Sequence, residues 1–189
     1  MKDITNRFWN LLEPEHSRAE AFCRRLTGNR EDGDDLYQEA LLAAMQKLDS
    51  LRDESAFRPW LYRIVINKYR NRCRQPWWRR LVNLNPEIID SQPVGDPAEV
   101  SAARRWLQRA FRALNAEEQA MVTLFELEGW SVAELSDMFN KPEGTIKARL
   151  FRARRKMREE IDRYFPDNET TYVSSEAEYA IPQKKPSRE

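Results

Sequence analysis

The feature that most constrains the fold is the segment of residues 131–157, which predicts two helices joined by a tight turn. Ser131 and Glu134 have the spacing of a capping box at the start of the first helix. Asn140 tolerates the left-handed backbone that a turn requires, and Pro142 prevents the first helix from continuing. This is the layout of a helix-turn-helix, whose second helix enters the major groove of DNA.

The second helix of this segment separates an apolar stripe from a basic face. Its apolar residues recur at the spacing of one buried helix face and are Ile146, Leu150, Ala153 and Met157. The residues that lie largely off this stripe are Thr145, Lys147, Arg149, Arg152, Arg155 and Lys156. A solvated basic helix on a bundle would carry the same charges. The coincidence of cap, turn breaker and one-sided stripe favours contact with DNA.

The charge of the chain is divided into blocks, although the total is only +1. Residues 31–54 hold eight acidic residues against two basic ones, whereas residues 63–80 hold seven basic residues and no acidic one. Residues 141–158 hold eight basic residues against one acidic residue. Two separate basic segments indicate two places that contact nucleic acid.

Several classes of protein are disfavoured by the composition. Cys23, Cys73 and His16 show no metal-ligand spacing and no disulfide framework, which fits a reducing cytoplasm. The N-terminus lacks the apolar core of a signal peptide, and no run approaches the roughly 18 apolar residues of a membrane span. No nucleophile, general-base pair or phosphate-binding glycine loop stands out. We therefore expect no catalytic site, no metal and no cofactor.

The chain is predicted to be all-α, with two small helical domains joined by a flexible linker. Before the helix-turn-helix, apolar periodicity and stop signals predict helices at 16–26, 34–48, 57–74, 98–114 and 115–129. The proline-rich connection at residues 79–97 shows no clear apolar periodicity. A connection of this length is typical of a domain boundary or a functional segment. The predicted bounds are 1–78 for the first domain, 79–97 for the linker, 98–165 for the second domain and 166–189 for a disordered tail.

Two further surfaces are candidates for binding. In residues 57–74, Tyr62, Tyr69 and the arginines are predicted to face away from the core, where aromatic rings stack on unpaired bases and cations follow phosphates. Phe57 and Trp60 are assigned to the core. The second surface is a helix face that consists of Asp35, Gln38 and Glu39. It suits a basic protein partner, and from the residues alone a merely solvated face is equally plausible.

Helix capping is a simpler role for one or two residues of the acidic stretch at 32–39. Asp32 or Asp34 is expected to cap the helix and to favour its dipole.

Three motifs in this order and spacing resemble a known family. They are DDLYQEA at 34–40, FRPWLYRIVIN at 57–67 and PEGTIKARLFRAR at 142–154. Over about residues 5–163 the chain resembles bacterial RNA polymerase sigma factors of the extracytoplasmic-function group, in the sigma-70 family. The resemblance implies that the first domain is sigma domain 2 and the second is sigma domain 4. Trp77, Trp78 and the tail are not family motifs and receive no role.

The resemblance also implies roles for particular residues. The face of Asp35, Gln38 and Glu39 would bind the β′ clamp helices of core RNA polymerase. Residues 49–56 would form a base-capture loop. The implied contacts to the promoter −10 element are Arg63, Asn67, Lys68, Arg70, Asn71 and Arg74. The implied contacts to the −35 element are Glu143, Gly144, Thr145, Lys147, Arg149, Arg152 and Arg155.

The implied activity is that of a non-enzymatic initiation factor for transcription. Its implied partners are core RNA polymerase, through the β′ clamp helices and the β flap, promoter DNA, and an anti-sigma factor. The main alternative is a stand-alone helix-turn-helix regulator. Such regulators usually dimerise, and this alternative leaves residues 30–80 unexplained. An enzyme that acts on nucleic acid is the second alternative, without a visible site.

Overall fold

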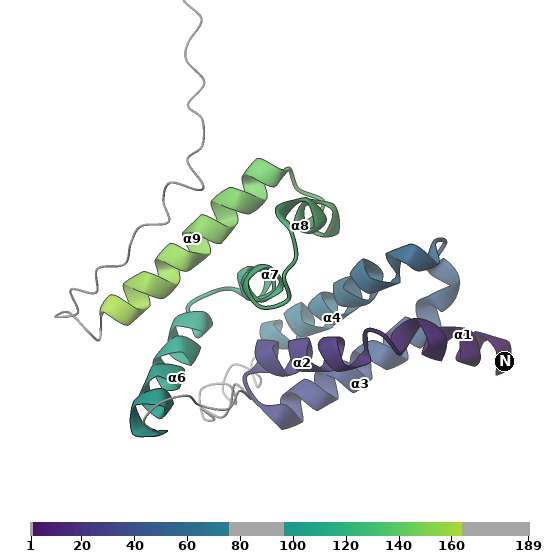
Figure 1. Cartoon of the computed structure of the whole chain (residues 1–189), viewed down its shortest axis with the longest axis horizontal. Coiled ribbons are helices and arrows are strands. Elements are labelled where there is room, and N and C mark those ends of the chain that lie inside the picture. The colour runs from purple at the N-terminus through teal and green to yellow at the C-terminus, as the bar shows by residue number, and fades with distance from the viewer. Residues whose placement is uncertain (1, 76–96, 164–189) are drawn as a thin grey trace, which may run out of the picture.

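A computed structural model describes residues 2–75 and 97–163, and within those ranges it contains helices and turns but no strand. The helices of the first unit are α1 (Lys2–Leu12), α2 (His16–Thr27), α3 (Arg30–Lys47) and α4 (Phe57–Arg74). Two short 3-10 helices, η1 (Leu48–Ser50) and η2 (Glu54–Ala56), connect α3 to α4. The second unit consists of α6 (Pro97–Arg112), α7 (Ala116–Glu126), α8 (Val132–Phe139) and α9 (Glu143–Asp162) (Figure 1). The prediction of an all-α fold is confirmed.

Part of the predicted organisation lies outside the described residues. The predicted linker, 79–97, lies there except for Pro97, which begins α6. The predicted tail, 166–189, and the pair Trp77 and Trp78 also lie outside the described residues.

The first unit differs from expectation at two helix starts. The sequence did not predict α1, whose Phe8 side chain is fully buried. Helix α3 begins at Arg30, because the side chain of Asn29 accepts a hydrogen bond from the backbone N–H of Asp32 at 2.8 Å. The prediction that Asp32 or Asp34 caps this helix is therefore wrong.

Helices α2 and α3 approach each other closely at Gly33. A Cβ atom at this position would lie 2.5 Å from Cα and 2.8 Å from N of Arg24, so only glycine fits without movement of the backbone. At the residue after Gly33, Oδ1 of Asp34 accepts a hydrogen bond from Nε of Arg24 at 2.6 Å. The carboxylate that was expected to cap α3 thus joins α3 to α2 instead.

The helix-turn-helix forms as predicted. The Oγ of Ser131 accepts from the backbone N–H of Glu134 at 3.2 Å, and Oε2 of Glu134 accepts from the backbone N–H of Ser131 at 2.7 Å. Asn140 ends α8 in the left-handed conformation, with φ 51°, and Pro142 stands at the N-cap of α9. A second capping box, on Asn115, begins α7, which was also predicted.

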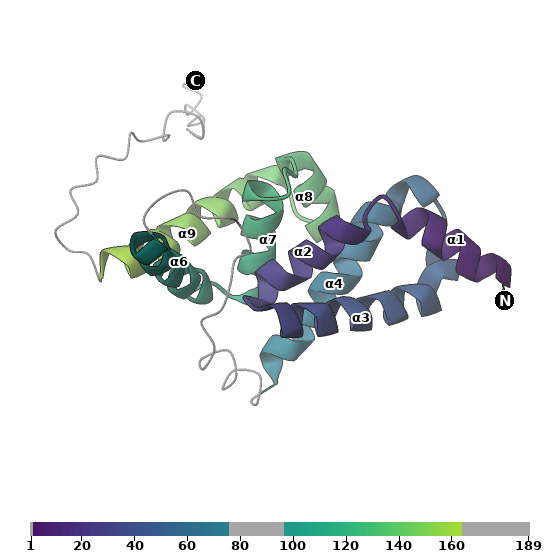
Figure 2. The same ribbon diagram turned by 60° about the horizontal axis from the view of Figure 1, so that its bottom comes forward.

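The two units pack directly on each other, which the sequence did not predict. Helix α7 lies against α2 and α4 on one side and against α8 and α9 on the other (Figures 1 and 2). One cluster of buried apolar side chains runs without a break from Phe8 in α1 to Ala153 in α9. Among the described residues the two units therefore share one core.

Candidate nucleic-acid interface

Helix α9 buries the stripe that the sequence predicted. Ile146, Leu150 and Ala153 are at most 3% exposed, and Met157 is half-buried against the same core. At 100° per residue, the side of the helix opposite this stripe is its outward face. The residues centred on that face are Gly144, Ala148, Phe151, Arg152 and Arg155.

The predicted −35 contacts fall into different positions around α9. Arg152 and Arg155 are exposed on the outward face, and Arg155 lies 3.3 Å from Glu159 of its own helix. Arg149 lies nearer to the core and forms an ion pair with Glu117 of α7. Of these three arginines, Arg152 and Arg155 are therefore the better placed to meet DNA.

The remaining predicted −35 contacts lie in the first turns of α9. Glu143, Gly144 and Lys147 are exposed, whereas Thr145 is half-buried. Lys147 lies 4.0 Å from Glu143, within the same helix. The backbone N–H groups of a helix N-terminus favour anions, so this end of α9 suits a phosphate group.

Other cations of α9 hold the helix in place. Nζ of Lys156 donates to Glu118 of α7 at 2.6 Å, and Nε of Arg154 donates to Glu126 at 2.7 Å. Burial raises the pKa of the Glu118 carboxyl. Hydrogen bonds from Lys156 and from the backbone of Asn115 contribute to a larger opposite effect, so the pKa lies below its usual value. The basic residues of α9 thus divide into an outward set and a set that fixes the helix on α7.

One outward residue of α9 was missed by the sequence reasoning. Phe151 is 56% exposed and lies among the arginines of the outward face. An apolar side chain in this position suits the methyl group of a thymine. Its position off the predicted apolar stripe was the available signal.

Helix α4 carries a largely exposed polar row. Arg63, Asn67, Arg70 and Arg74 lie at i, i+4, i+7 and i+11, on the side away from its buried residues. Of these four, Arg70 is half-buried and the other three are exposed. Of the other predicted −10 contacts, Asn71 is exposed beside this row, whereas Lys68 is half-buried on a different side of the helix.

The prediction that Tyr62 and Tyr69 are available for DNA is wrong in this arrangement. They are 0% and 4% exposed, and burial raises the pKa of both hydroxyls. The Tyr62 ring packs on Trp130, with 5.3 Å between ring centroids. The Tyr69 hydroxyl donates to Oε1 of Gln119 at 2.6 Å. The buried face of α4 is wider than predicted because it packs against both units.

The loop before α4 is exposed but internally ordered. Asp53 accepts hydrogen bonds from the backbone N–H of Ser55 at 2.9 Å and from its hydroxyl at 2.8 Å. These bonds lower the pKa of the Asp53 carboxyl. Nε of Arg7 donates to Glu54 at 2.7 Å, which joins the loop to α1.

The predicted protein-binding face lies on the exposed side of α3. Asp35, Gln38 and Glu39 are all exposed there. Leu42 extends the same face by one turn and is 64% exposed, which the sequence reasoning did not predict. Oε1 of Glu39 accepts from Arg72 of α4 at 2.6 Å, so part of its charge is neutralised within the chain.

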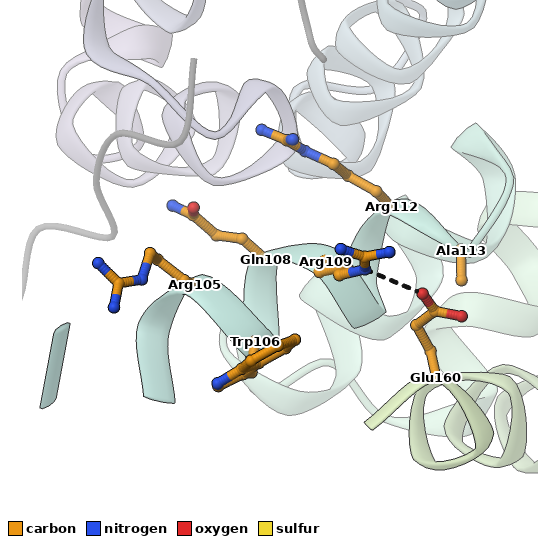
Figure 3. A pocket seen from close by; sticks show the side chains of 7 residues that line it. All are labelled: Arg105, Trp106, Gln108, Arg109, Arg112, Ala113 and Glu160. Atoms are coloured by element: carbon orange, nitrogen blue, oxygen red, sulfur yellow. Dashed lines mark hydrogen bonds and ion pairs between the residues drawn. The ribbon is translucent and has the colours of Figure 1, made fainter. Parts of the chain in front are cut away.

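A third basic area lies on α6 and was not predicted. An open hollow of about 660 Å³ is lined by Arg105, Trp106, Gln108, Arg109, Arg112, Ala113 and Glu160, whose side chains are drawn in Figure 3. Nε of Arg109 lies 3.2 Å from Oε1 of Glu160, which joins α6 to the end of α9. This ion pair helps to hold the first helix of the second unit against the helix-turn-helix.

The described residues contain neither a cluster of metal ligands nor a helix that could span a membrane. No group of His, Cys, Asp or Glu side chains in residues 2–75 and 97–163 is arranged to hold a metal ion. No helix in those ranges combines the length and the apolar character that crossing a membrane requires.

Comparison with known proteins identifies the family of the chain. Residues 11–79 match the family described as Sigma-70 region 2, and residues 104–157 match Sigma-70, region 4. The ECF RNA polymerase sigma factor SigM of Mycobacterium tuberculosis is 33% identical over 151 residues, which cover 79% of this chain and 74% of that protein. The ECF RNA polymerase sigma-E factor of Escherichia coli is 34% identical over 134 residues, which cover 65% of this chain and 70% of that protein.

Solved structures show the same fold. The sigma factor RpoE of Bartonella quintana, in complex with the anti-sigma factor NepR, matches with a TM-score of 0.57 and 24% identity, covering 86% of this chain and 98% of that one. CnrH in complex with the cytosolic domain of CnrY matches with the same TM-score and identity, covering 84% and 90%. A stand-alone regulator would use only the helix-turn-helix. This alternative is less supported, because residues 11–79 of the first unit also match a sigma factor region. The chain therefore belongs to the extracytoplasmic-function sigma factors of the sigma-70 family, which act in transcription initiation.

Proposed function

We propose that this sigma factor works through three separate surfaces. The α3 face of Asp35, Gln38, Glu39 and Leu42 binds the β′ clamp helices of core RNA polymerase. The polar row of α4 and the loop of residues 49–56 hold the −10 element. The outward face of α9 reads the −35 element as duplex. The observation that carries the proposal is the position of Arg152 and Arg155, which project opposite the buried stripe of α9.

Melting of the −10 element follows from the chemistry of the second surface. Taking a base out of the stack costs a few kcal/mol. The cations and amides of the α4 row, Arg63, Asn67, Arg70 and Arg74, follow the phosphates of the separated strand. The loop is already held by Asp53 and Ser55, so less conformational entropy is lost when it captures a base.

Binding two promoter elements allows each contact to be weak. Once one domain is bound, the second contact becomes intramolecular and benefits from a high effective concentration. We propose domain bounds of 1–78 and 98–165, with residues 79–97 as linker and 166–189 as tail. In this proposal the second domain also contacts the β flap, and the chain has no enzymatic activity of its own.

Control by an anti-sigma factor and a cytoplasmic site of action are also part of the proposal. RpoE was solved in complex with NepR, which is described as an anti-sigma factor, and CnrH was solved in complex with the cytosolic domain of CnrY. We extend this to the present chain and propose that an anti-sigma factor controls it. The site of action that we propose is the cytoplasm, where core polymerase and promoter DNA are found.

Reconstitution with core polymerase tests the function directly. We expect the purified chain to bind bacterial core RNA polymerase and to start transcription from a defined subset of a promoter library. The selected sequences would give both the −10 and the −35 preference. A folded chain that neither binds the polymerase nor directs initiation would contradict the proposal.

Arg152→Ala is expected to weaken binding to −35 duplex DNA by about 10- to 100-fold, because one contact of a charged side chain with a base edge is worth about 1–3 kcal/mol. The measurement is binding of the holoenzyme to duplexes with and without the −35 element. Arg154→Ala is the matched control, since Arg154 lies on the same helix but pairs with Glu126. Equal loss of −35 affinity in both variants would argue against the assigned outward face.

A further inference from the structure

Helix α1 lies almost entirely outside the part of the chain that matches a sigma factor region. The match begins at residue 11, whereas α1 spans Lys2–Leu12. The helix is nevertheless packed into the first unit, because Phe8 and Leu12 are at most 1% exposed. The roles that follow from the family match therefore do not extend to α1, whose role follows from its contacts.

Helix α1 contacts the loop of residues 49–56 and the helix that follows it. Nε of Arg7 donates to Oε1 of Glu54, the first residue of η2, at 2.7 Å. The neighbouring Phe8 ring packs edge-on against Phe57, the first residue of α4, with 6.1 Å between ring centroids and 74° between ring planes. Aromatic pairs prefer such a T-shaped arrangement. Helix α1 thus reaches both the loop and the point where the loop ends.

The turn after α1 adds a contact to the same region. Oε2 of Glu15 lies 3.7 Å from Nε of Arg58, the second residue of α4. Both side chains are partly buried, so salt screens their attraction less than it would at the surface. Contacts from Arg7, Phe8 and Glu15 therefore meet positions 54, 57 and 58, where the loop joins α4.

Within the loop, the backbone is hydrogen-bonded while several side chains remain exposed. Leu51 is buried, and its N–H donates to the carbonyl of Leu48 at 2.9 Å. The N–H of Ala56 donates to the carbonyl of Asp53 at 3.1 Å. The loop thus presents polar side chains from an ordered backbone, and those that are exposed beside Glu54 are Arg52, Asp53 and Ser55.

These three exposed side chains are of the kinds that read the edge of an unpaired base. Arg52 can donate hydrogen bonds, the Asp53 carboxylate can accept them, and the Ser55 hydroxyl can do both. A base that has left the stack is recognised by such bonds to its edge. Hydrogen bonds weaken steeply when their angle departs from the optimum. Discrimination between bases therefore depends on how firmly the loop holds these side chains in place.

We propose that α1 holds the base-capture loop in the conformation that receives an unpaired −10 base, and that Arg7 is a positioning residue for this capture. Arg7 acts through Glu54 and does not itself touch the base. The inference rests on the proposed role of residues 49–56. An exposed ion pair contributes little, so its loss is expected to shift the equilibrium of the loop about threefold to fivefold. A shift of this size lowers base discrimination and leaves the domain folded.

Capture of a base is measured with single-stranded oligonucleotides. The holoenzyme, which is this chain with core RNA polymerase, is mixed with −10 strands of the sequence selected from the promoter library, each with one abasic position. The affinity for the intact strand divided by that for the abasic strand is the capture factor of that position. The captured base is the position with the largest factor in the wild type. Because both strands carry the same phosphates, the salt-dependent phosphate contacts cancel in this ratio.

Charge removal and charge exchange test the role of Arg7. Arg7→Ala is expected to lower the capture factor about threefold to fivefold and to leave the affinity for the abasic strand unchanged. Arg7→Glu brings like charges together and should lower the factor at least as much. Combining Arg7→Glu with Glu54→Arg restores an ion pair and should restore the factor. Arg163→Ala is the matched control with an unchanged factor, because it removes another exposed ion pair, with Glu160 at the end of α9.

Hydrogen exchange of the free chain is a second measurement, which needs neither DNA nor polymerase. The amides of Ser55 and Ala56 are bonded within the loop, so Arg7→Ala should speed their exchange by a similar factor. Unchanged exchange, an unchanged capture factor in both Arg7 variants, or a double variant that stays as low as Arg7→Glu would overturn the inference. A wild type in which no abasic position weakens binding would instead contradict base capture, the proposed function, while faster exchange in Arg7→Ala would still show that Arg7 orders the loop.

Discussion

Asp35→Lys is expected to lower the affinity of the chain for core RNA polymerase on the order of 100-fold. The reason is that like charges that face each other across an interface cost several kcal/mol, and each 1.4 kcal/mol changes the affinity tenfold. Asp35 is exposed on α3, so its replacement leaves the packing of the domain intact. The measurement is the dissociation constant of the sigma–core complex at two salt concentrations.

Asp35 is a sharper probe of this face than Glu39. Because Glu39 accepts from Arg72, its reversal would also leave a cation of α4 without that partner. Leu42→Ala is the companion variant, since this exposed apolar side chain has no role in the core and its loss should affect only binding. Glu13→Lys, also exposed, is the control for a change of net charge. Unchanged affinity of Asp35→Lys would favour a merely solvated face.

Local sequence patterns were sufficient for the helix-turn-helix and for most helix bounds. The caps at Ser131 and Asn115, and the turn at Asn140, depend on residues that are close in the chain. The start of α3 was missed because both Asn29 and the nearby aspartates are good caps, and only the structure shows which one accepts the hydrogen bond.

Contacts between distant segments were the part that sequence could not supply. The pattern of Tyr62 and Tyr69 is compatible with a base-stacking face and with an interface, because aromatic rings with a polar tip suit both. Their burial depends on Trp130 and Gln119, which lie 50 or more residues away along the chain. Leu42 and Phe151 were missed for a different reason. On α3 and α9 the binding faces were predicted without a large apolar side chain, whereas both of these residues are exposed there.

Gly33→Ala is expected to destabilise the protein by about 2–3 kcal/mol, the typical upper range for overpacking a well-packed contact. The added Cβ would lie 2.5 Å from the Cα of Arg24, so α2 or α3 must move. This cost exceeds the gain of at most about 1 kcal/mol that alanine brings to a helix interior. Thermal unfolding is the measurement, and a Tm lower by about 5–10 °C is expected for a change of this size.

Gly144→Ala provides the matched control, because a Cβ at Gly144 would meet no atom within 4 Å. That variant is expected to be neutral or slightly stabilising, since alanine favours the helix without a clash. A Tm of Gly33→Ala equal to that of Gly144→Ala would contradict the close α2–α3 contact. The contact also matters for function, because Asp35 lies only two residues beyond Gly33. A shift of α3 would move the polymerase-binding face, so Gly33→Ala should weaken polymerase binding even below its Tm.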